Sequence, residues 1–358
     1  MDPYDITKIF NDMELDLIAS MKKALENGNT GDWQKQKLLN LGRYKAANAR
    51  IIGSYTDTLE EKISTLLKGS FITGGQNTDK ILNAIKDYLT KPVTVTAIGD
   101  GSFYKVNENR MNALIKSVKS DLGKAEMAML RQADDVYRQT IFKSQMNFNA
   151  GTLSLSQSVD MATKDFLDKG FNCITYKDGR KLNIASYAEM ALRTSAQRAV
   201  FVGEGSRRDE WGVHTVVISS HNNSSDLCMP WQGRVYIDNV YSGGKEGEGE
   251  YPLLSTAIDD GLFHPSCKHN MSTWFEGVNT LPEQVNNEEA SRNYEAEQKQ
   301  RYMERQVRKY KRRETGSLDS QNIKSSNNKV KEWQGNLREH IKANPQLSRQ
   351  SWREQIKA

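Results

Sequence analysis

Residues with the chemistry of metal ligands gather in one stretch of this chain. Cys228 opens the run Cys-Met-Pro-Trp-Gln-Gly, and a later run reads His-Pro-Ser-Cys-Lys-His from residue 264 to 269. A structural zinc site needs four nitrogen or sulfur ligands in a tetrahedron, commonly two from each of two turns. The spacing therefore predicts a structural Zn²⁺ ion. Its predicted ligands are Cys228, His264, Cys267 and His269, with His221 as the substitute for any that faces away.

The same residues leave other interpretations open. Cys228 and Cys267 could be small buried apolar residues, with the histidines making ordinary hydrogen bonds. Cys267 beside His264 or His269 could form a thiolate–imidazolium nucleophile, although no orienting acid accompanies it. His221 and His269, each followed by asparagine, also suggest a metal-dependent nuclease, without reproducing the order and spacing of one. We assign no catalytic residue.

Composition limits the class of protein. A chain of 358 residues is long enough for two or three domains, and its 37% hydrophobic content fits long exposed helices better than one globule. No apolar run approaches the ~20 residues of a membrane span, and the N-terminus shows no secretory signal. The three cysteines make no disulfide framework, so we expect folding in a reducing cytoplasm.

Residues 1–150 are predicted to be a helical N-terminal region with long helices. Apolar residues from Met111 to Val136 follow an a/d-like repeat, which indicates one helix packed against a partner helix. Gly74-Gly75 and the segment 91–101 are expected to interrupt the helices. This half contains no catalytic constellation.

Residues 151–285 are predicted to be a small α+β module. A helix is expected at 154–169, and an Asp-Gly pair between two β-prone runs indicates a hairpin within 171–184. Ser186 and Glu189 form a capping-box pattern, which predicts a helix that ends near residues 203–205. Strands are expected at 213–218 and 234–237. The metal site would tie the loop 234–263 back onto the strand before it.

Residues 286–358 form the predicted basic tail. This segment holds 17 Lys and Arg against 10 Asp and Glu, a net charge of +7, which leaves −2 for residues 1–285. A charged helix followed by a polar linker at 317–328 is expected. Its cations predict salt-dependent binding to nucleic acid, unless the helix is a solvated face or docks on an acidic partner. The predicted contacts are Arg301, Arg305, Arg308, Lys309, Lys311, Arg312 and Arg313.

The run from Tyr187 to Trp274 resembles the phage minor capsid protein 2 family, within the phage Mu protein F-like head morphogenesis proteins. The resemblance rests on the helix from Ala188, on the Cys-Met-Pro-Trp-Gln-Gly run and on the His-Pro-Ser-Cys-Lys-His run. Many relatives carry Cys-x-x-Cys before the glycine and Cys-x-Cys at the end. Here Ser225 stands in place of the first cysteine, and His269 in place of the last.

The resemblance implies a structural component of a tailed-phage virion, in the capsid interior near the portal. Implied partners are the portal protein, other capsid or scaffold proteins and packaged DNA, with a role in head assembly or genome delivery. The expected fold class is α+β, with a mainly helical N-terminal region, a small α+β module and a basic helical tail. The alternative is an enzyme, either a metal-dependent nuclease or an injected effector acting on host components.

Overall fold

A computed structural model describes residues 3–26, 32–85, 96, 98, 101–151, 153–283 and 285–354. The chain divides into two compact units, and each is assembled from segments that are not consecutive. Unit 1 is formed mainly by residues 62–119 and 190–296. Unit 2 is formed by residues 4–61, 120–189 and the chain from 297 onward. The boundaries predicted from the sequence, at residues 150 and 285, instead cut the chain into three consecutive regions. These boundaries stay a prediction.

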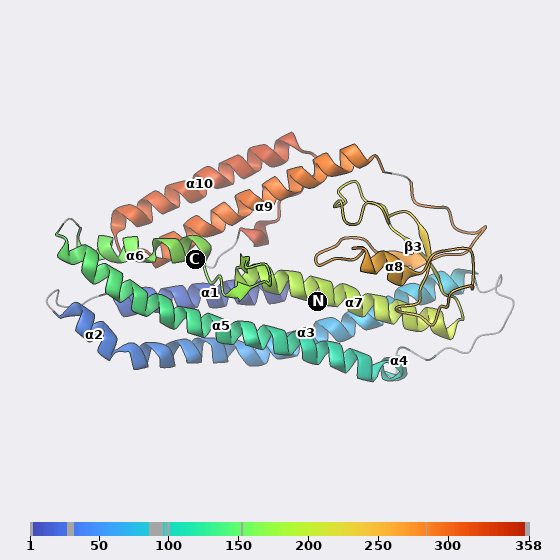
Figure 1. Ribbon diagram of the computed structural model, residues 1–358, viewed down its shortest axis with the longest axis horizontal. Coiled ribbons are helices and arrows are strands. Elements are labelled where there is room, and N and C mark those ends of the chain that lie inside the picture. The colour runs from blue at the N-terminus through green and yellow to red at the C-terminus, as the bar shows by residue number, and fades with distance from the viewer. Residues whose placement is uncertain are drawn as a thin grey trace. The chain divides into compact units, whose positions relative to one another are not determined.

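Most of the described chain is helical (Figure 1). The helices are α1 (Pro3–Leu25), α2 (Trp33–Leu39), α3 (Leu41–Ile85), α4 (Ser102–Val106), α5 (Glu108–Asn149), α6 (Leu155–Lys169), α7 (Ile184–Glu210), α8 (Leu254–Asp259), α9 (Asn287–Gly316) and α10 (Ser320–Ala343). The strands are β1 (Ile174–Thr175), β2 (Lys181–Leu182), β3 (Thr215–Ile218), β4 (Val235–Ile237) and β5 (Met271–Thr273). A mainly helical α+β fold is confirmed. Among the helices described here, none is both long enough and apolar enough to cross a bilayer.

The predicted long helix is α5, and its apolar repeat is its buried stripe. Every member of the repeat from Met111 to Met129 is buried, because residues three and four apart share one face of a helix. Beyond Met129 the stripe continues through Ala133 and Tyr137, while Val136 is only partly covered. In unit 2, Tyr137 stacks on Tyr44 of α3, with ring centroids 4.1 Å apart.

The prediction that Gly74-Gly75 interrupts a helix is wrong, because α3 runs unbroken from Leu41 to Ile85. A Cβ atom at Gly74 would lie 2.1 Å from the carbonyl oxygen of Val200, and one at Gly203 would lie 2.0 Å from that of Phe71. These glycines let the backbones of α3 and α7 meet inside unit 1. Most of the segment 91–101 lies outside the described residues.

The local predictions around α7 had mixed outcomes. The helix at 154–169 is confirmed as α6, and the hairpin as β1 paired with β2. The start of α7 at Ser186 was wrong: the helix begins at Ile184, after Asn183 Oδ1 has accepted a hydrogen bond from the Ala185 amide. Its predicted end near residue 205 was also wrong, because α7 continues to Glu210.

The C-terminal segment is a helical pair rather than a helix and a linker. The predicted polar linker at 317–328 is wrong, because Asp319 caps α10 by accepting from the Gln321 and Asn322 amides. Val330 and Leu337 give α10 a buried face. The sequence alone does not reveal this helix, because residues 317–328 are mostly polar and the buried apolar residues Val330 and Leu337 come only after them.

Candidate metal site

The sheet of unit 1 brings two distant loops together. Its strand order is β4-β3-β5, and both neighbours run antiparallel to the central β3. The chain leaves β3 at Ile218 and enters β4 after the loop that carries Cys228. Ile218 also pairs with Met271, the first residue of β5. The turn before β5 therefore lies at the same end of β3 as the loop that carries Cys228.

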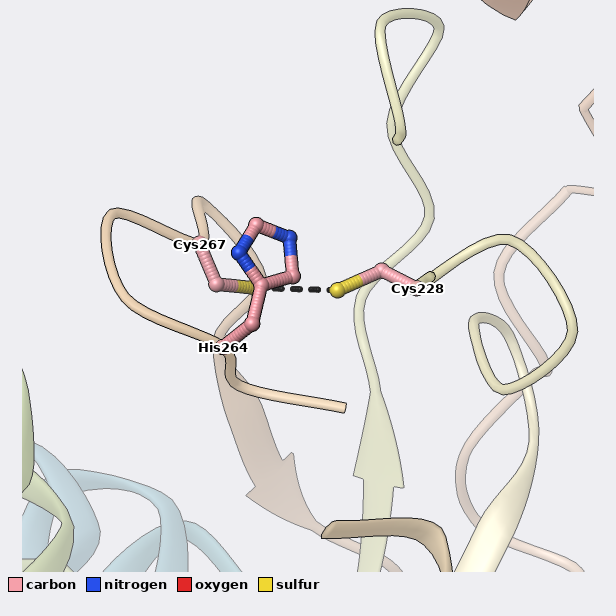
Figure 2. A group of neighbouring side chains, drawn as sticks. All are labelled: Cys228, His264 and Cys267. Carbon is pink, nitrogen blue, oxygen red and sulfur yellow. Dashed lines mark hydrogen bonds between the residues drawn. The ribbon is translucent and has the colours of Figure 1, made fainter. Parts of the chain in front are cut away.

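Two thiols and an imidazole meet between these loops (Figure 2). The Sγ atoms of Cys228 and Cys267 lie 3.4 Å apart. The ligand atoms of Cys228, Cys267 and His264 all lie within 4.8 Å of one another. Both cysteines are buried, with 1% and 7% of their surface exposed, and His264 is half-buried. The predicted convergence of these three residues is therefore present.

His269 approaches the same thiols from the second loop. Its Nδ1 lies 3.3 Å from Cys267 Sγ, and its Nε2 lies 3.0 Å from Gln232 Oε1. Because Gln232 Oε1 accepts, Nε2 is the nitrogen that carries the proton, and Nδ1 presents its lone pair to the thiol. A hydrogen bond of this kind from the distal nitrogen is what orients a metal-ligating histidine.

Ser225 supports His264 in a comparable way. His264 Nδ1 lies 3.0 Å from the carbonyl oxygen of Pro265, and its Nε2 lies 2.8 Å from Ser225 Oγ. Ser225 comes from the turn in which the Cys228 amide donates to the Ser225 carbonyl. Ser225 is thus within the site, where its hydroxyl contacts the imidazole of His264. Both ring nitrogens of His264 have a hydrogen-bond partner here, so one of them must be released before the ring can bind a metal.

His221 has other partners. Its Nε2 lies 3.0 Å from the Lys268 carbonyl oxygen and 3.1 Å from Ser219 Oγ. Its ring contacts that of His269, with centroids 4.7 Å apart. Neither His221 nor His269 belongs to the group of three residues whose ligand atoms all lie within 4.8 Å of one another, although His269 contacts Cys267 directly. Sequence reasoning named His221 as a substitute but did not identify Gln232 or Ser225 as supports, because neither is a typical zinc ligand.

The thiols share protons unequally. The hydrogen bond from Cys267 lowers the pKa of the Cys228 thiol far below its usual range, with His264 and His269 acting in the same direction. The same bond, together with burial, raises the pKa of Cys267. The hydrogen bond with Cys228 raises the pKa of His264. These shifts favour negative charge at Cys228 and positive charge at His264. Metal ligands must give up their protons, so a bound cation would compete with the protons of this group.

The cations proposed for nucleic acid mostly contact their own unit. Six of the seven bond to an acceptor within unit 2, and Arg305 is exposed. Arg312 donates to the Leu167 carbonyl oxygen at 3.0 Å, and Arg313 pairs with Asp168. The other contacts are Arg301 with Glu297, Lys309 with Asp168, Arg308 with the Arg353 carbonyl, and Lys311 with the Glu354 carbonyl. Nucleic-acid binding by these residues stays a prediction.

Comparison with known proteins places this arrangement in a family. The family described as phage minor capsid protein 2 matches residues 2–342. A structural protein of Lactococcus phage LL-H is 23% identical over 375 residues, covering 99% of this chain and 98% of that protein. A structural protein of Lactococcus phage mv4 is 34% identical over 116 residues, which covers 29% of this chain and 94% of that protein. No solved structure matches with significance.

The family match extends from the first helix into α10, so it covers both units and the candidate metal site alike. The full-length relative matches over nearly its whole length as well. The chain therefore belongs to the phage minor capsid protein 2 family, and at that level it is a structural protein of a phage particle.

Proposed function

We propose that this protein is a minor structural component in the head interior near the portal, made in the host cytoplasm and taking part in genome packaging or delivery. The observation that supports this most is the family match over residues 2–342, together with a relative of matching length described as a structural protein. Helices α3 and α5, of 45 and 42 residues, offer long surfaces for the portal, capsid or scaffold proteins.

Cross-linking of intact virions tests the location. Exposed lysines on the long helices, Lys68 of α3 and Lys116 of α5, are suitable attachment points for an amine-reactive cross-linker. We expect their cross-linked peptides to come from the portal protein or its immediate neighbours. Cross-links confined to tail proteins, or absence of the chain from purified particles, would contradict the proposal.

We propose that the Cys/His site holds a structural Zn²⁺ ion. The donor set suits zinc, which binds thiolate and imidazole at about 2.3 and 2.0 Å. Tetrahedral geometry then places two sulfur ligands about 3.8 Å apart, and a sulfur and a nitrogen about 3.5 Å apart. The corresponding separations here are 3.4 Å between the sulfurs and 3.3 Å between Cys267 Sγ and His269 Nδ1. These two pairs would open by a few tenths of an ångström around an ion, and His269 would also have to move, because it is not among the three residues whose ligand atoms converge.

Zinc would cross-link the two loops that the sheet brings together. Cys228 would come from one loop, and His264, Cys267 and His269 from the other. The site lies in the core cluster of the module, which includes Ile218, Tyr236 and Met271. A bound ion in this position stabilises the arrangement and leaves no coordination position that the chemistry of a hydrolase requires.

An enzymatic function would require one of the histidines to act as a general base. A nuclease would need His221 or His269 as a general base, yet Nε2 of each contacts a carbonyl oxygen within the module. Plasmid DNA incubated with the purified protein and Mg²⁺, Mn²⁺ or Zn²⁺ separates the two functions. We expect the DNA to remain supercoiled. Cleavage that is lost in an H269A variant that still folds would replace the structural proposal by a nuclease.

We propose further that α9 contacts packaged DNA through its exposed face. Lys299 and Arg305 are exposed on that helix. Phosphate contacts make affinity fall with salt, and each cation removed lowers that salt dependence by about one unit of slope. We expect the double substitution K299Q/R305Q to weaken duplex binding at low salt. R50Q, at an exposed arginine of α3 in the same unit, is the matched control. Equal loss in both variants would exclude α9 as the specific contact.

A further inference from the structure

The two buried thiols have a second chemistry that does not involve a metal. Cys228 and Cys267 are 39 residues apart in sequence, and their sulfur atoms face one another at 3.4 Å across the gap between the loops (Figure 2). Each sits in a tight turn: the Cys228 amide donates to the Ser225 carbonyl, and the Cys267 amide to the His264 carbonyl. A disulfide requires a sulfur separation of about 2.0 Å, so closure needs a shift of about 1.4 Å.

The two thiols differ in access. Cys267 lines a pocket of about 310 Å³ together with Arg193, Gln197, Lys268 and Asn270. Cys228 does not line this pocket and is 1% exposed. A small oxidant in the pocket therefore reaches Cys267 first, with Cys228 directly behind it.

We propose that Cys228 and Cys267 are a dithiol that hydrogen peroxide converts into an intramolecular disulfide whenever the site holds no metal. The disulfide and the zinc ion are then alternative cross-links between the same two loops, since a sulfur engaged in one cannot form the other. The exclusion by metal rests on the proposed zinc site, whereas disulfide formation rests only on the geometry of the two thiols.

The oxidation proceeds in two balanced steps. Cys267 sulfur attacks one peroxide oxygen, the O–O bond breaks, and the departing hydroxide takes the thiol proton as water, which leaves a sulfenic acid. Cys228 sulfur then attacks the Cys267 sulfur, the S–S bond forms and the S–O bond breaks. The second hydroxide leaves as water with the proton that Cys228 and His264 share. Two electrons pass from the sulfurs to one peroxide, and two waters form.

Cys173 provides an internal control. It belongs to the other unit, whereas Cys228 and Cys267 face each other within unit 1. A selective loss of two thiols out of three is therefore the signature of the proposed pair. Non-selective oxidation would also consume Cys173.

The test uses the full-length protein, reduced, treated with EDTA and desalted, then exposed to hydrogen peroxide. We expect denatured thiol titration to fall from three thiols per chain to one, with a mass loss of about 2 Da per chain and a Cys228–Cys267 cross-linked peptide. The C173S variant should fall from two thiols to none. Uniform loss of all three thiols, intermolecular dimers, or higher oxidation of single cysteines would overturn the proposal.

Two further measurements fix the order of events and the role of metal. In C228S, a dimedone probe should trap a sulfenic acid on Cys267, while in C267S the adduct on Cys228 should form at least tenfold more slowly. Equal trapping would overturn the assigned order. Protein reloaded with Zn²⁺ should lose its thiols at least tenfold more slowly than the metal-free form.

The zinc content of the untreated protein separates the two proposals. If the protein binds no zinc but forms the disulfide, the dithiol proposal holds and the metal-site proposal fails. If the protein binds one zinc per chain but forms no disulfide after the zinc is removed, the metal-site proposal holds and the dithiol proposal fails.

Discussion

Arg208 and Asp238 form an ion pair from which solvent is excluded. The guanidinium Nη2 donates to Asp238 Oδ2 at 2.7 Å, and both side chains are 0% exposed. Asp238 Oδ1 accepts from the Val240 and Tyr241 amides, so the same carboxylate fixes the start of the glycine-rich loop after β4. In unit 1 this pair joins α7 to that loop.

Neutralising the carboxylate should destabilise the protein strongly. D238N keeps an oxygen for the two amides but removes the nearest counter-charge of the buried guanidinium, which leaves it the more distant carboxylate of Glu204 at 3.8 Å. Breaking a buried pair in this way costs about 3–5 kcal/mol. Urea unfolding followed by circular dichroism measures the loss. D178N, at an exposed pair with Arg180, is the control and should not change the midpoint measurably. Similar midpoints for D238N and D178N would show that the buried pair contributes little.

Glu204 should make the stability of the protein depend on pH. Burial raises the pKa of Glu204 to about 7, and Arg208 opposes that shift. In the unfolded chain a glutamate titrates near pH 4.3, so the native state binds the extra proton between about pH 4.5 and 7. The free energy of unfolding therefore falls by roughly 3 kcal/mol as pH rises through that window. Below the window, the stabilisation that this protonated carboxyl contributes is fully present.

The variant E204Q isolates this effect, because glutamine does not titrate. We expect wild type and E204Q to differ little at pH 5, and wild type to be the less stable at pH 8. Urea midpoints at the two pH values give the comparison. Parallel pH profiles would mean that Glu204 titrates normally in the folded protein.

Zinc content should depend on His269 and not on His221. We expect about one Zn²⁺ per chain by elemental analysis, lost in C228S and reduced in H269A. H221A is the matched control, because its ring contacts His269 but its Nε2 faces the Lys268 carbonyl. At a free zinc concentration of a thousand times Kd, binding stabilises the folded state by about 4 kcal/mol. Chelation should lower Tm accordingly, and a Tm indifferent to EDTA would rule out a stabilising metal.

Two glycines of α3 should respond in opposite directions to alanine. A Cβ at Gly74 would lie 2.1 Å from the Val200 carbonyl oxygen, whereas one at Gly69 has no heavy atom within 4 Å. G69A should stabilise the protein by up to about 1 kcal/mol through helix propensity. G74A should destabilise it, because two backbones must separate. Thermal melts of the pair decide the matter, and a neutral G74A would mean that α3 and α7 do not meet there.

Local pattern predicted much of the fold, since it depends on neighbouring residues. The apolar repeat of α5 identified its buried face from Met111 to Met129, and the Asp-Gly pair identified the hairpin. Prediction from local pattern failed where a residue packs against a partner that is distant in sequence. Gly74 looked like a helix break because its packing against Val200 is invisible in the local sequence.

The candidate site shows the same division. Residue type and spacing predicted that Cys228, His264 and Cys267 would converge, because thiols and imidazoles are the ligands that zinc prefers. The roles of Ser225 and Gln232 depend on geometry that the sequence does not display. The cations of α9 were counted correctly as charges, but their acceptors, such as Asp168 for Arg313, lie 145 residues away.

Glu14 of α1 is 1% exposed, and its carboxylate accepts from the Phe171 amide and lies 3.6 Å from Arg312 of α9. Phe171 therefore emerges from the ribosome well after Glu14, and Arg312 emerges only after all of residues 190–296 have been synthesised as well. The first helix must therefore remain without its contact to α9 until residue 312 has been synthesised. A prematurely terminated chain would expose this acidic, otherwise enclosed position to the quality-control proteases of the host.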